Sequence, residues 1–316
     1  MNKNNTIELL NAAGLVADTD PYTPTPAPGI KNLSLLGLIT PGTFFYVDSV
    51  NGSDSYDGLA WATPKATIDA AISLCTAAAG DTIVVAPHHA ETVTTAITMD
   101  VTNVSIVGLH RGRLMPTVTG NAAIDAITIT AAGCSVSGIK FAAPGTDAQT
   151  SDINIAAANC TVKDTVHIGS ATSVNKVAII TITAAGHDAL VDGVKIYNSV
   201  VEVVGAIAVE GTAARVEICN CMVLDVIGFT NGALHVAAIA VQIYVHDNIF
   251  QNAKAATAVV NFAANATGVC TRNFVSGRHT TIASNIVTGT STDWFENYVT
   301  EEAVKNGLLM PAVDAD

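Results

Sequence analysis

A seven-residue string, Ile-Thr-Ile-Thr-Ala-Ala-Gly, occurs twice without change, at residues 127–133 and 180–186. The two copies begin 53 residues apart, and a related segment, Ile-Asn-Ile-Ala-Ala at 153–157, lies near their midpoint. Apolar and polar residues alternate in each copy, which is the pattern of a β-strand with one buried face. A strand that returns at a fixed interval indicates a repeat protein in which each repeat contributes the same element.

The same strand pattern continues toward both ends of the chain at intervals of 26 to 30 residues. Its first residues are Ile97, Ile127, Ile153, Ile180, Ile207, Leu234 and Val260. A second strand follows nine to eleven residues later, with inward residues Ile106, Val136, Val162, Val191, Ile218, Val245 and Cys270. Two positions further on lie bend residues, mostly Gly, Asn or Asp: Gly108, Gly138, Asp164, Gly193, Asn220, Asp247 and Arg272. A repeat length in the mid-twenties of residues, with apolar and polar residues alternating in each strand, fits a three-sheet β-solenoid. The alternation excludes helical repeats.

A series of short motifs precedes the coils. They are Tyr46-Val47-Asp48, Asn51-Gly52-Ser53-Asp54, Asp57-Gly58, Pro64-Lys65-Ala66-Thr67-Ile68 and Gly80-Asp81-Thr82-Ile83. Together they resemble the N-terminal segment of pectin-lyase-like right-handed β-helix proteins, and with the coils the resemblance covers about residues 44–300. It implies an all-β fold, a right-handed parallel β-helix solenoid. It implies less about function, because proteins of this fold include lyases, hydrolases, epimerases and viral structural proteins.

The chain is expected to form three segments: an N-terminal arm (1–43), the β-helix (44–300) and a C-terminal tail (301–316). The arm is rich in Pro over 20–32, so we expect it to be extended and to serve as an anchor. The β-helix divides into an opening segment with its cap (44–96) and the coils (97–300). The cap is predicted to be a helix, with Thr63 as N-cap, Pro64 as first residue and apolar residues at helical spacing through 66–79.

The charge balance restricts the partners. The chain carries 14 basic and 27 acidic residues, a net charge of −13, so it repels phosphate backbones and we expect no nucleic-acid partner. We expect no membrane span and no secretory signal, because apolar runs are interrupted and the N-terminal region carries Glu8 and Asp18. The six cysteines form no Cys-x-x-Cys pair, so they are expected to be small core residues, and no cofactor is predicted.

Catalysis on a β-helix needs polar residues stacked on one outer face. The first-strand outward column, which is Thr98, Thr128, Asn154, Thr181, Ala208, His235 and Asn261, holds no carboxylate. The second-strand column contains Lys163, Asp192, Cys219 and His246 as a sparse polar series. His246 and Asp247 are adjacent in a strand and are expected to point to opposite faces, so they would form no dyad. We predict no catalytic residues and favour a non-enzymatic protein.

Two smaller sets of polar residues have structural or metal-binding interpretations. Asp48, Asn51, Asp54 and Asp57 offer oxygen ligands every three residues, a pattern compatible with a Ca²⁺ loop. The other interpretation is that these side chains form Asx turns in a Gly/Ser loop, and we predict no metal there. Asn248 and Asn273 occupy equivalent inward positions and predict a structural asparagine ladder along the axis.

Two outward columns are candidates for an interface between β-helices. One outward column contains His110, Lys140, Val166, Lys195, Met222, Ile249 and Phe274. Its last three members, Met222, Ile249 and Phe274, form an apolar series, and exposed apolar columns usually mark a covered surface. Thr128, Asn154 and Thr181 form a small, neutral series that could pack closely. We expect a homo-oligomer, most simply a trimer around a threefold axis. Cover by the arm or the tail would explain the same pattern.

The favoured hypothesis is a non-enzymatic bacteriophage structural protein, a capsid decoration (cement) or head-fibre subunit on the virion surface. It follows from the resemblance to phage virion β-helix proteins, the separate arm and the missing catalytic set. The arm would contact the major capsid protein or another virion protein. The alternative is a polysaccharide-binding or -degrading β-helix protein, of the lyase, hydrolase or tailspike type, with a glycan as ligand. A bacterial surface adhesin is a third hypothesis, which the lack of an export signal disfavours.

Overall fold

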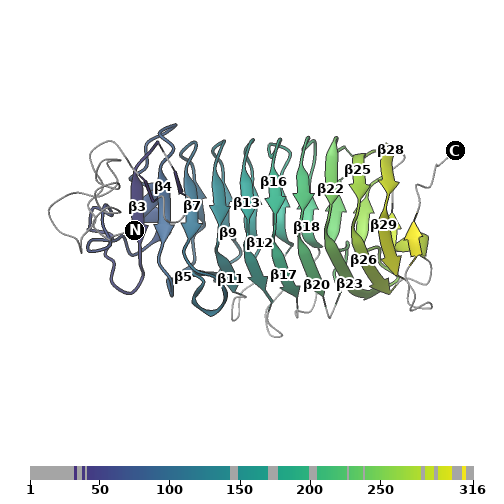
Figure 1. Ribbon diagram of the computed structural model, residues 1–316, viewed down its shortest axis with the longest axis horizontal. Helices are drawn as coiled ribbons and strands as arrows, with labels where there is room; N and C mark the ends of the chain where they lie inside the picture. Colours follow the sequence, from purple (N-terminus) through teal and green to yellow (C-terminus); the bar gives the residue numbers. More distant parts are fainter. Residues whose placement is uncertain are drawn as a thin grey trace, which may run out of the picture.

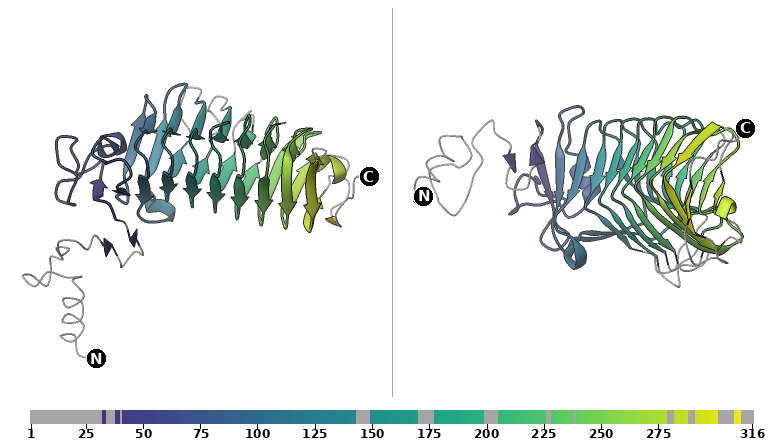
Figure 2. Two further views of the ribbon diagram at one scale, coloured as in Figure 1. Left: turned by 90° about the horizontal axis from the view of Figure 1, so that it is seen from above. Right: turned by 45° about the vertical axis from the view of Figure 1, so that its right-hand side comes forward.

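The structure is a computed structural model in which the described residues are 32–33, 38–39, 41–142, 149–169, 177–198, 205–225, 228–237, 239–278, 282–287, 291–300 and 308–310. Over this part the chain winds as a right-handed parallel β-solenoid of about seven turns (Figure 1). Its coils stack along one axis, with the first strands at one end and the last strands at the other (Figure 2). The predicted fold class is therefore confirmed at this level. Most of the predicted arm (1–43) and of the tail (301–316) lies outside the described residues.

Three long sheets form the sides of the solenoid. Sheet 1 contains β3 (Phe44–Val47), β4 (Thr82–Val85), β7 (Ser105–Gly108), β10 (Ser135–Ser137), β13 (Thr161–Lys163), β16 (Leu190–Asp192), β19 (Glu217–Cys219), β22 (Ile243–His246), β25 (Thr267–Thr271) and β28 (Ser291–Phe295). Sheet 2 contains β5 (Ala90–Val93), β8 (Thr117–Gly120), β11 (Lys140–Ala142), β14 (Val166–Ile168), β17 (Lys195–Asn198), β20 (Met222–Asp225), β23 (Ile249–Ala255), β26 (Phe274–Arg278), β29 (Asn297–Thr300) and β30 (Leu308–Met310).

Sheet 3 completes each coil. It contains β6 (Ile97–Met99), β9 (Asp125–Ile129), β12 (Ser151–Ile155), β15 (Ala178–Ile182), β18 (Gly205–Val209), β21 (Leu234–Val236), β24 (Val260–Phe262) and β27 (Ile286–Val287). Strand pairs within the three sheets are parallel, except β29 with β30. Three short helices, α2 (Ile68–Ile72), η2 (Gly112–Leu114) and α3 (Ile282–Asn285), and the antiparallel pair β1 (Asn32–Leu33) and β2 (Leu38–Ile39) complete the described elements.

The core consists of apolar columns that run along the axis. Ile127, Ile153 and Ile180 pair in register in sheet 3 and are fully buried, as the repeat predicts. Val136 and Val162 form the matching column in sheet 1. Each such side chain contributes roughly 1.5–3 kcal/mol by leaving water. Because side chains alternate across a strand, this burial also fixes which residues face outward.

The bend between sheet 1 and sheet 2 uses the left-handed backbone region in successive coils. Positive φ angles occur at Gly138, Asp164, Gly193, Asn220, Asp247, Arg272 and Glu296. Except for Glu296, these are the predicted bend residues. Gly108 was also predicted to be a bend residue, but its φ angle is not positive. The coil that contains Gly108 differs because η2 is inserted after it, and Thr117 rather than His110 pairs with Lys140.

The predicted cap helix is wrong in length and in its start. The N-cap is Thr67, whose hydroxyl accepts a hydrogen bond from the amide of Ala70, and the helix spans only five residues. Thr63 and Pro64 lie outside it because Lys65 pairs with β3 through its amide and the carbonyl of Tyr46. The carboxylate of Asp81 accepts from the amide of Thr76, which ends the helical pattern early.

Candidate functional site

A groove of about 510 Å³ lies on the outer surface of sheet 2, beside the bends of three successive coils. It is lined by Arg111, Gly112, Met115, Lys140, Asp164, Thr165, Val166, Ile168, Gly193, Lys195, Tyr197 and Asn220. The strands beneath it, β11, β14 and β17, are hydrogen-bonded neighbours. The floor of the groove therefore follows the axis of the solenoid.

Two lysines give this groove positive charge. Lys140 and Lys195 occupy the same outward column, separated by Val166. Their Cα atoms are therefore roughly 10 Å apart, since neighbouring strands lie about 4.8 Å apart. Among the described residues neither amine forms an ion pair, whereas Arg111 pairs with Asp164 at 2.9 Å. The two amines are available to an anionic ligand.

An apolar surface lies beside the two lysines. Ile168 and Tyr197 pair in register two positions further along β14 and β17, and they are 42% and 39% exposed. An exposed tyrosine ring next to an aliphatic side chain presents a flat surface that can contact the face of a sugar ring. The groove thus combines cations with an amphipathic surface.

A second, smaller groove of about 200 Å³ lies on the outer face of sheet 3. Its lining includes Asp125, Asn154, Thr181, Glu210 and His235. The Asp125 carboxylate accepts hydrogen bonds from Ser151 and Asn154. Asp125 and Glu210 come from coils three strand steps apart, so they are separated by roughly 14 Å along the axis alone, which exceeds the separation of catalytic carboxylate pairs in glycosidases. The described residues of this groove therefore do not form such a pair.

In the structure, the predicted polar series on sheet 1 forms two separate clusters. In the first, the Lys163 amine contacts the Asp192 carboxylate at 2.7 Å, and the Cys219 thiol donates to Asp192 at 3.7 Å. The Lys163 amine and then Asn220 lower the pKa of Asp192. Burial, followed by the charges of Asp192 and Glu217, raises the pKa of Cys219 to about 12.

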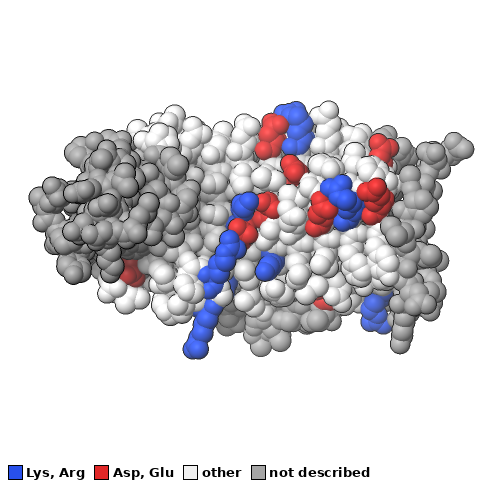
Figure 3. Space-filling model, in the orientation of Figure 1, with Lys and Arg blue, Asp and Glu red and all other residues white. Residues whose placement is uncertain are grey.

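The second cluster contains a pair that was predicted to be apart. The Nδ1 atom of His246 lies 2.7 Å from the Asp247 carboxylate, and its Nε2 atom lies 3.0 Å from that of Glu217. The expectation that adjacent strand residues diverge is wrong here, because Asp247 is the bend residue, with φ of 57°. The Arg272 guanidinium and then His246 hold the pKa of Asp247 well below its usual range. Figure 3 shows charged side chains of both signs gathered in small clusters on this face.

The carboxylates of the acidic loop before the coils accept hydrogen bonds from groups in the same N-terminal segment. Asp48 accepts from the Val50 amide and the Asn51 side chain. Asp54 accepts from the amides of residues 66 and 67, and Asp57 accepts from the Leu59 amide. These are the turn and capping contacts of the Asx interpretation.

The asparagine ladder extends beyond the two predicted residues. The Asn248 side chain donates to Oδ1 of Asn273 at 2.9 Å, and the Asn273 side chain donates to Oδ1 of Asn297 at 3.0 Å. All three residues are buried. Asn297 was missed because the last coil is shorter than the repeat from which the series was read.

The interface candidates lie on two outer faces. Met222, Ile249 and Phe274 form one column of sheet 2, and the rings of Phe274 and Tyr298 are stacked with centroids 4.9 Å apart. Thr128, Asn154 and Thr181 form one column of sheet 3, in the predicted register. Thr181 and Asn154 line the smaller groove there.

Comparison with known proteins supports the fold. No protein-family model matches the chain, and no curated protein matches it. The crystal structure of pectate lyase Pel9A is similar, with a TM-score of 0.54 and 13% identity over 76% of this chain. The match spans 64% of that lyase chain. A rhamnogalacturonan lyase is 11% identical over 81% of this chain and 87% of its own, with a TM-score of 0.41. At this identity the likeness to Pel9A shows the parallel β-helix fold alone.

Proposed function

We propose that this protein binds an acidic polysaccharide along the groove of sheet 2. The observation that carries the proposal is the column formed by Lys140 and Lys195, whose amines form no ion pair among the described residues. They lie beside Ile168 and Tyr197 on a chain with a net charge of −13. Cations on a strongly acidic protein select a ligand that carries negative charge at that place.

A polymer fits this groove better than a small anion. The lysines repeat along the solenoid axis, so a linear chain laid along the axis meets both amines in turn. The exposed tyrosine ring of Tyr197 contacts a sugar face while the amines contact carboxylates. Pectate, the polysaccharide in the name of the similar lyase, is therefore the first ligand to test.

The proposal is binding and does not include cleavage. A β-helix lyase needs carboxylates that hold Ca²⁺ close to a basic side chain. The carboxylate that lines this groove is that of Asp164, and it is paired with Arg111. An assay for unsaturated products on the same polysaccharide separates a lyase from a binding protein.

The test compares affinity for polygalacturonate with affinity for neutral dextran by isothermal titration calorimetry. The wild-type chain is expected to bind polygalacturonate, more weakly at higher salt, and to leave dextran unbound. The double variant Lys140→Ala, Lys195→Ala should lose tenfold or more in affinity. Lys254→Ala is the matched control, because that lysine also lies on sheet 2 but contacts Thr230 outside the groove. Full affinity in the double variant would refute the proposal.

A structural role on a bacteriophage virion is the second candidate function. The observation that favours it is the apolar column of sheet 2, where Ile249 and Phe274 are 39% and 41% exposed. In this proposal the column packs between copies in a trimer, and the arm over 1–43 anchors a decoration or head-fibre subunit to the capsid. Light scattering on the full chain and on a chain without 1–43 should give the trimer mass in both cases. A monomer in both would contradict it.

A further inference from the structure

Three metal-ligating side chains meet on the outer face of sheet 1. Cys219 and His246 are opposite each other on the neighbouring strands β19 and β22, and Glu217 lies two residues before Cys219 on the same face. The thiol sulfur, an imidazole nitrogen and a carboxylate oxygen all lie within 4.8 Å of one another. Thiolate, imidazole and carboxylate are the ligand types of zinc sites in proteins.

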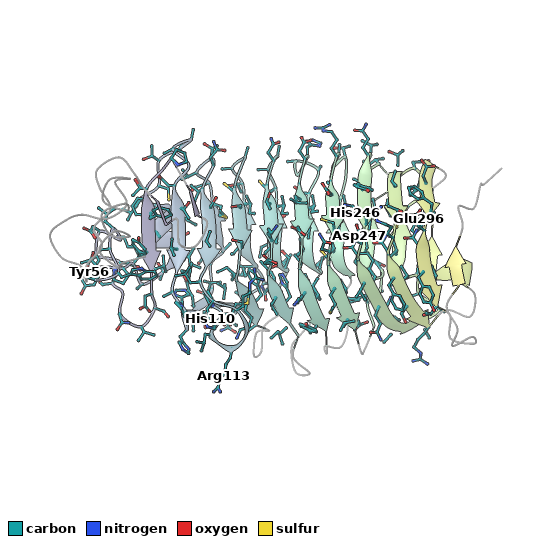
Figure 4. The ribbon with its side chains drawn as sticks, in the orientation of Figure 1. Tyr56, His110, Arg113, His246, Asp247 and Glu296 are labelled. Atoms are coloured by element: carbon teal, nitrogen blue, oxygen red, sulfur yellow. The ribbon has the colours of Figure 1, made fainter. Side chains whose placement is uncertain are left out.

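The contacts of His246 prepare it for a metal. Its Nδ1 atom lies 2.7 Å from the Asp247 carboxylate, which accepts two hydrogen bonds from Arg272, at 2.9 and 2.7 Å. A carboxylate beside the ring nitrogen that does not bind the metal is the contact that supports metal-binding histidines. Figure 4 shows His246 and Asp247 next to each other on the surface of the solenoid.

The other imidazole nitrogen then faces a negative charge. Nε2 of His246 lies 3.0 Å from a carboxylate oxygen of Glu217. An imidazole nitrogen and a carboxylate oxygen are both ligand types of zinc, and an ion beside this pair would contact both atoms.

We propose that Cys219, His246 and Glu217 bind a zinc ion through Sγ, Nε2 and a carboxylate oxygen. This inference does not depend on polysaccharide binding in the groove of sheet 2. Three protein ligands leave the fourth tetrahedral position to water or to an anionic ligand. A thiolate and an imidazole exclude Ca²⁺ and Mg²⁺ as the preferred occupants, because these ions select oxygen ligands.

The charges around the site balance with zinc bound. A divalent ion, one thiolate and one carboxylate sum to zero when the imidazole is neutral. The two neighbouring carboxylates already have partners, since Lys163 pairs with Asp192 and Arg272 pairs with Asp247. A bound cation stabilises the thiolate form of Cys219.

The geometry requires only small adjustments, because the three ligand atoms already lie within 4.8 Å of one another. Ligand atoms around tetrahedral zinc lie roughly 3.3–3.8 Å apart, given bond lengths of about 2.0–2.3 Å. Cys219 and His246 are opposite each other on the neighbouring strands β19 and β22, and both are largely buried. The side chain of Glu217 is 47% exposed, so it can rotate onto an ion that enters from solvent.

The test uses the full chain with Co²⁺ as a spectroscopic substitute for zinc. One equivalent of Co²⁺ should produce a thiolate-to-cobalt charge-transfer band and visible bands of tetrahedral intensity, and one equivalent of Zn²⁺ should abolish both. Cys219→Ser should lose the charge-transfer band. Cys75→Ser is the matched control and should keep it, because Cys75 is a free, partly accessible thiol at the capping helix.

A second variant tests the supporting contact rather than a ligand. Asp247→Asn is expected to weaken zinc affinity about 10- to 100-fold, the usual effect of losing such a partner. Circular dichroism of each variant checks that the solenoid is intact. A charge-transfer band that persists in folded Cys219→Ser, or no saturable binding of either ion by the wild-type chain, would overturn the proposal.

Discussion

The side-chain amide of Asn273 donates a hydrogen bond to Oδ1 of Asn297, 3.0 Å away in the next coil. On its other side, Oδ1 of Asn273 accepts from both the backbone amide and the side chain of Asn248. The same amide of Asn273 also contacts the carbonyls of Val245 and Thr271. Asn273 therefore joins three coils inside the core, where a polar side chain is stable only if its hydrogen bonds are made.

Asn273→Ala should destabilise the protein by about 3 kcal/mol or more. The change removes the acceptor of two buried donors, the backbone amide and one side-chain N–H of Asn248, and each such group costs about 1–3 kcal/mol. Oδ1 of Asn297 keeps its hydrogen bond from the backbone amide of residue 273. Urea unfolding followed by circular dichroism measures the loss. Asn51→Ala is the control, because that side chain makes an exposed contact with Asp48, and it should cost less than about 1 kcal/mol. Equal losses in the two variants would contradict the role of the ladder.

The strand register could be predicted because buried columns determine it. A shift of one residue would expose Ile153 and Ile180 and bury Asn154, so the repeat fixes the outward series as well. Thr128, Asn154 and Thr181 therefore pair as expected, and so do Lys163, Asp192 and Cys219. Lys140 and Lys195 also lie in one outward column of the sequence repeat, and the structure places them in that column.

Features outside the repeat could not be predicted in this way. The backbone of Asp247 turns its side chain toward His246, and strand alternation gives no signal for such a bend. Glu217 joins Cys219 because it lies two residues earlier on the same face, a position that the sequence columns did not include. The insertion of η2 displaced His110 from its expected column, since a repeat measured elsewhere does not reveal a local insertion.

Asp152→Ala should cost about 1–3 kcal/mol, because it removes the carboxylate that the buried Nδ1 atom of His167 contacts. Nδ1 of His167 lies 2.9 Å from Asp152, and its ring stacks on Phe141 within an otherwise apolar column of sheet 2. Adding His167→Phe should recover part of the loss, since it removes the polar ring and keeps the stack. Chemical denaturation of both variants provides the measurement. No recovery in the double variant would show that the cost arises elsewhere.

Asp192→Asn should remove a pH-dependent part of the stability. The lowered pKa of Asp192 in the folded protein means that its contribution is present above the ordinary value of 3.8 and is lost as pH falls through the folded pKa. The Lys163 amine is half exposed, so the contribution is at most about 1 kcal/mol. Melting temperatures from pH 3 to pH 6 should converge for the two proteins at the acid end. A constant difference across this range would be evidence against the pair.

Native protein should react very slowly with iodoacetamide at pH 8. Five of the six free thiols are buried, and Cys75 is partly accessible. Burial, followed by the charge of Asp81, raises the pKa of Cys75 to about 12, so very little of the reactive thiolate is present at pH 8. Mass spectrometry should find Cys75 labelled first, at a rate that rises about tenfold per pH unit, whereas unfolded protein should label at six cysteines within the same time. Rapid native labelling at a second cysteine would show that the coils open more readily than their buried columns imply.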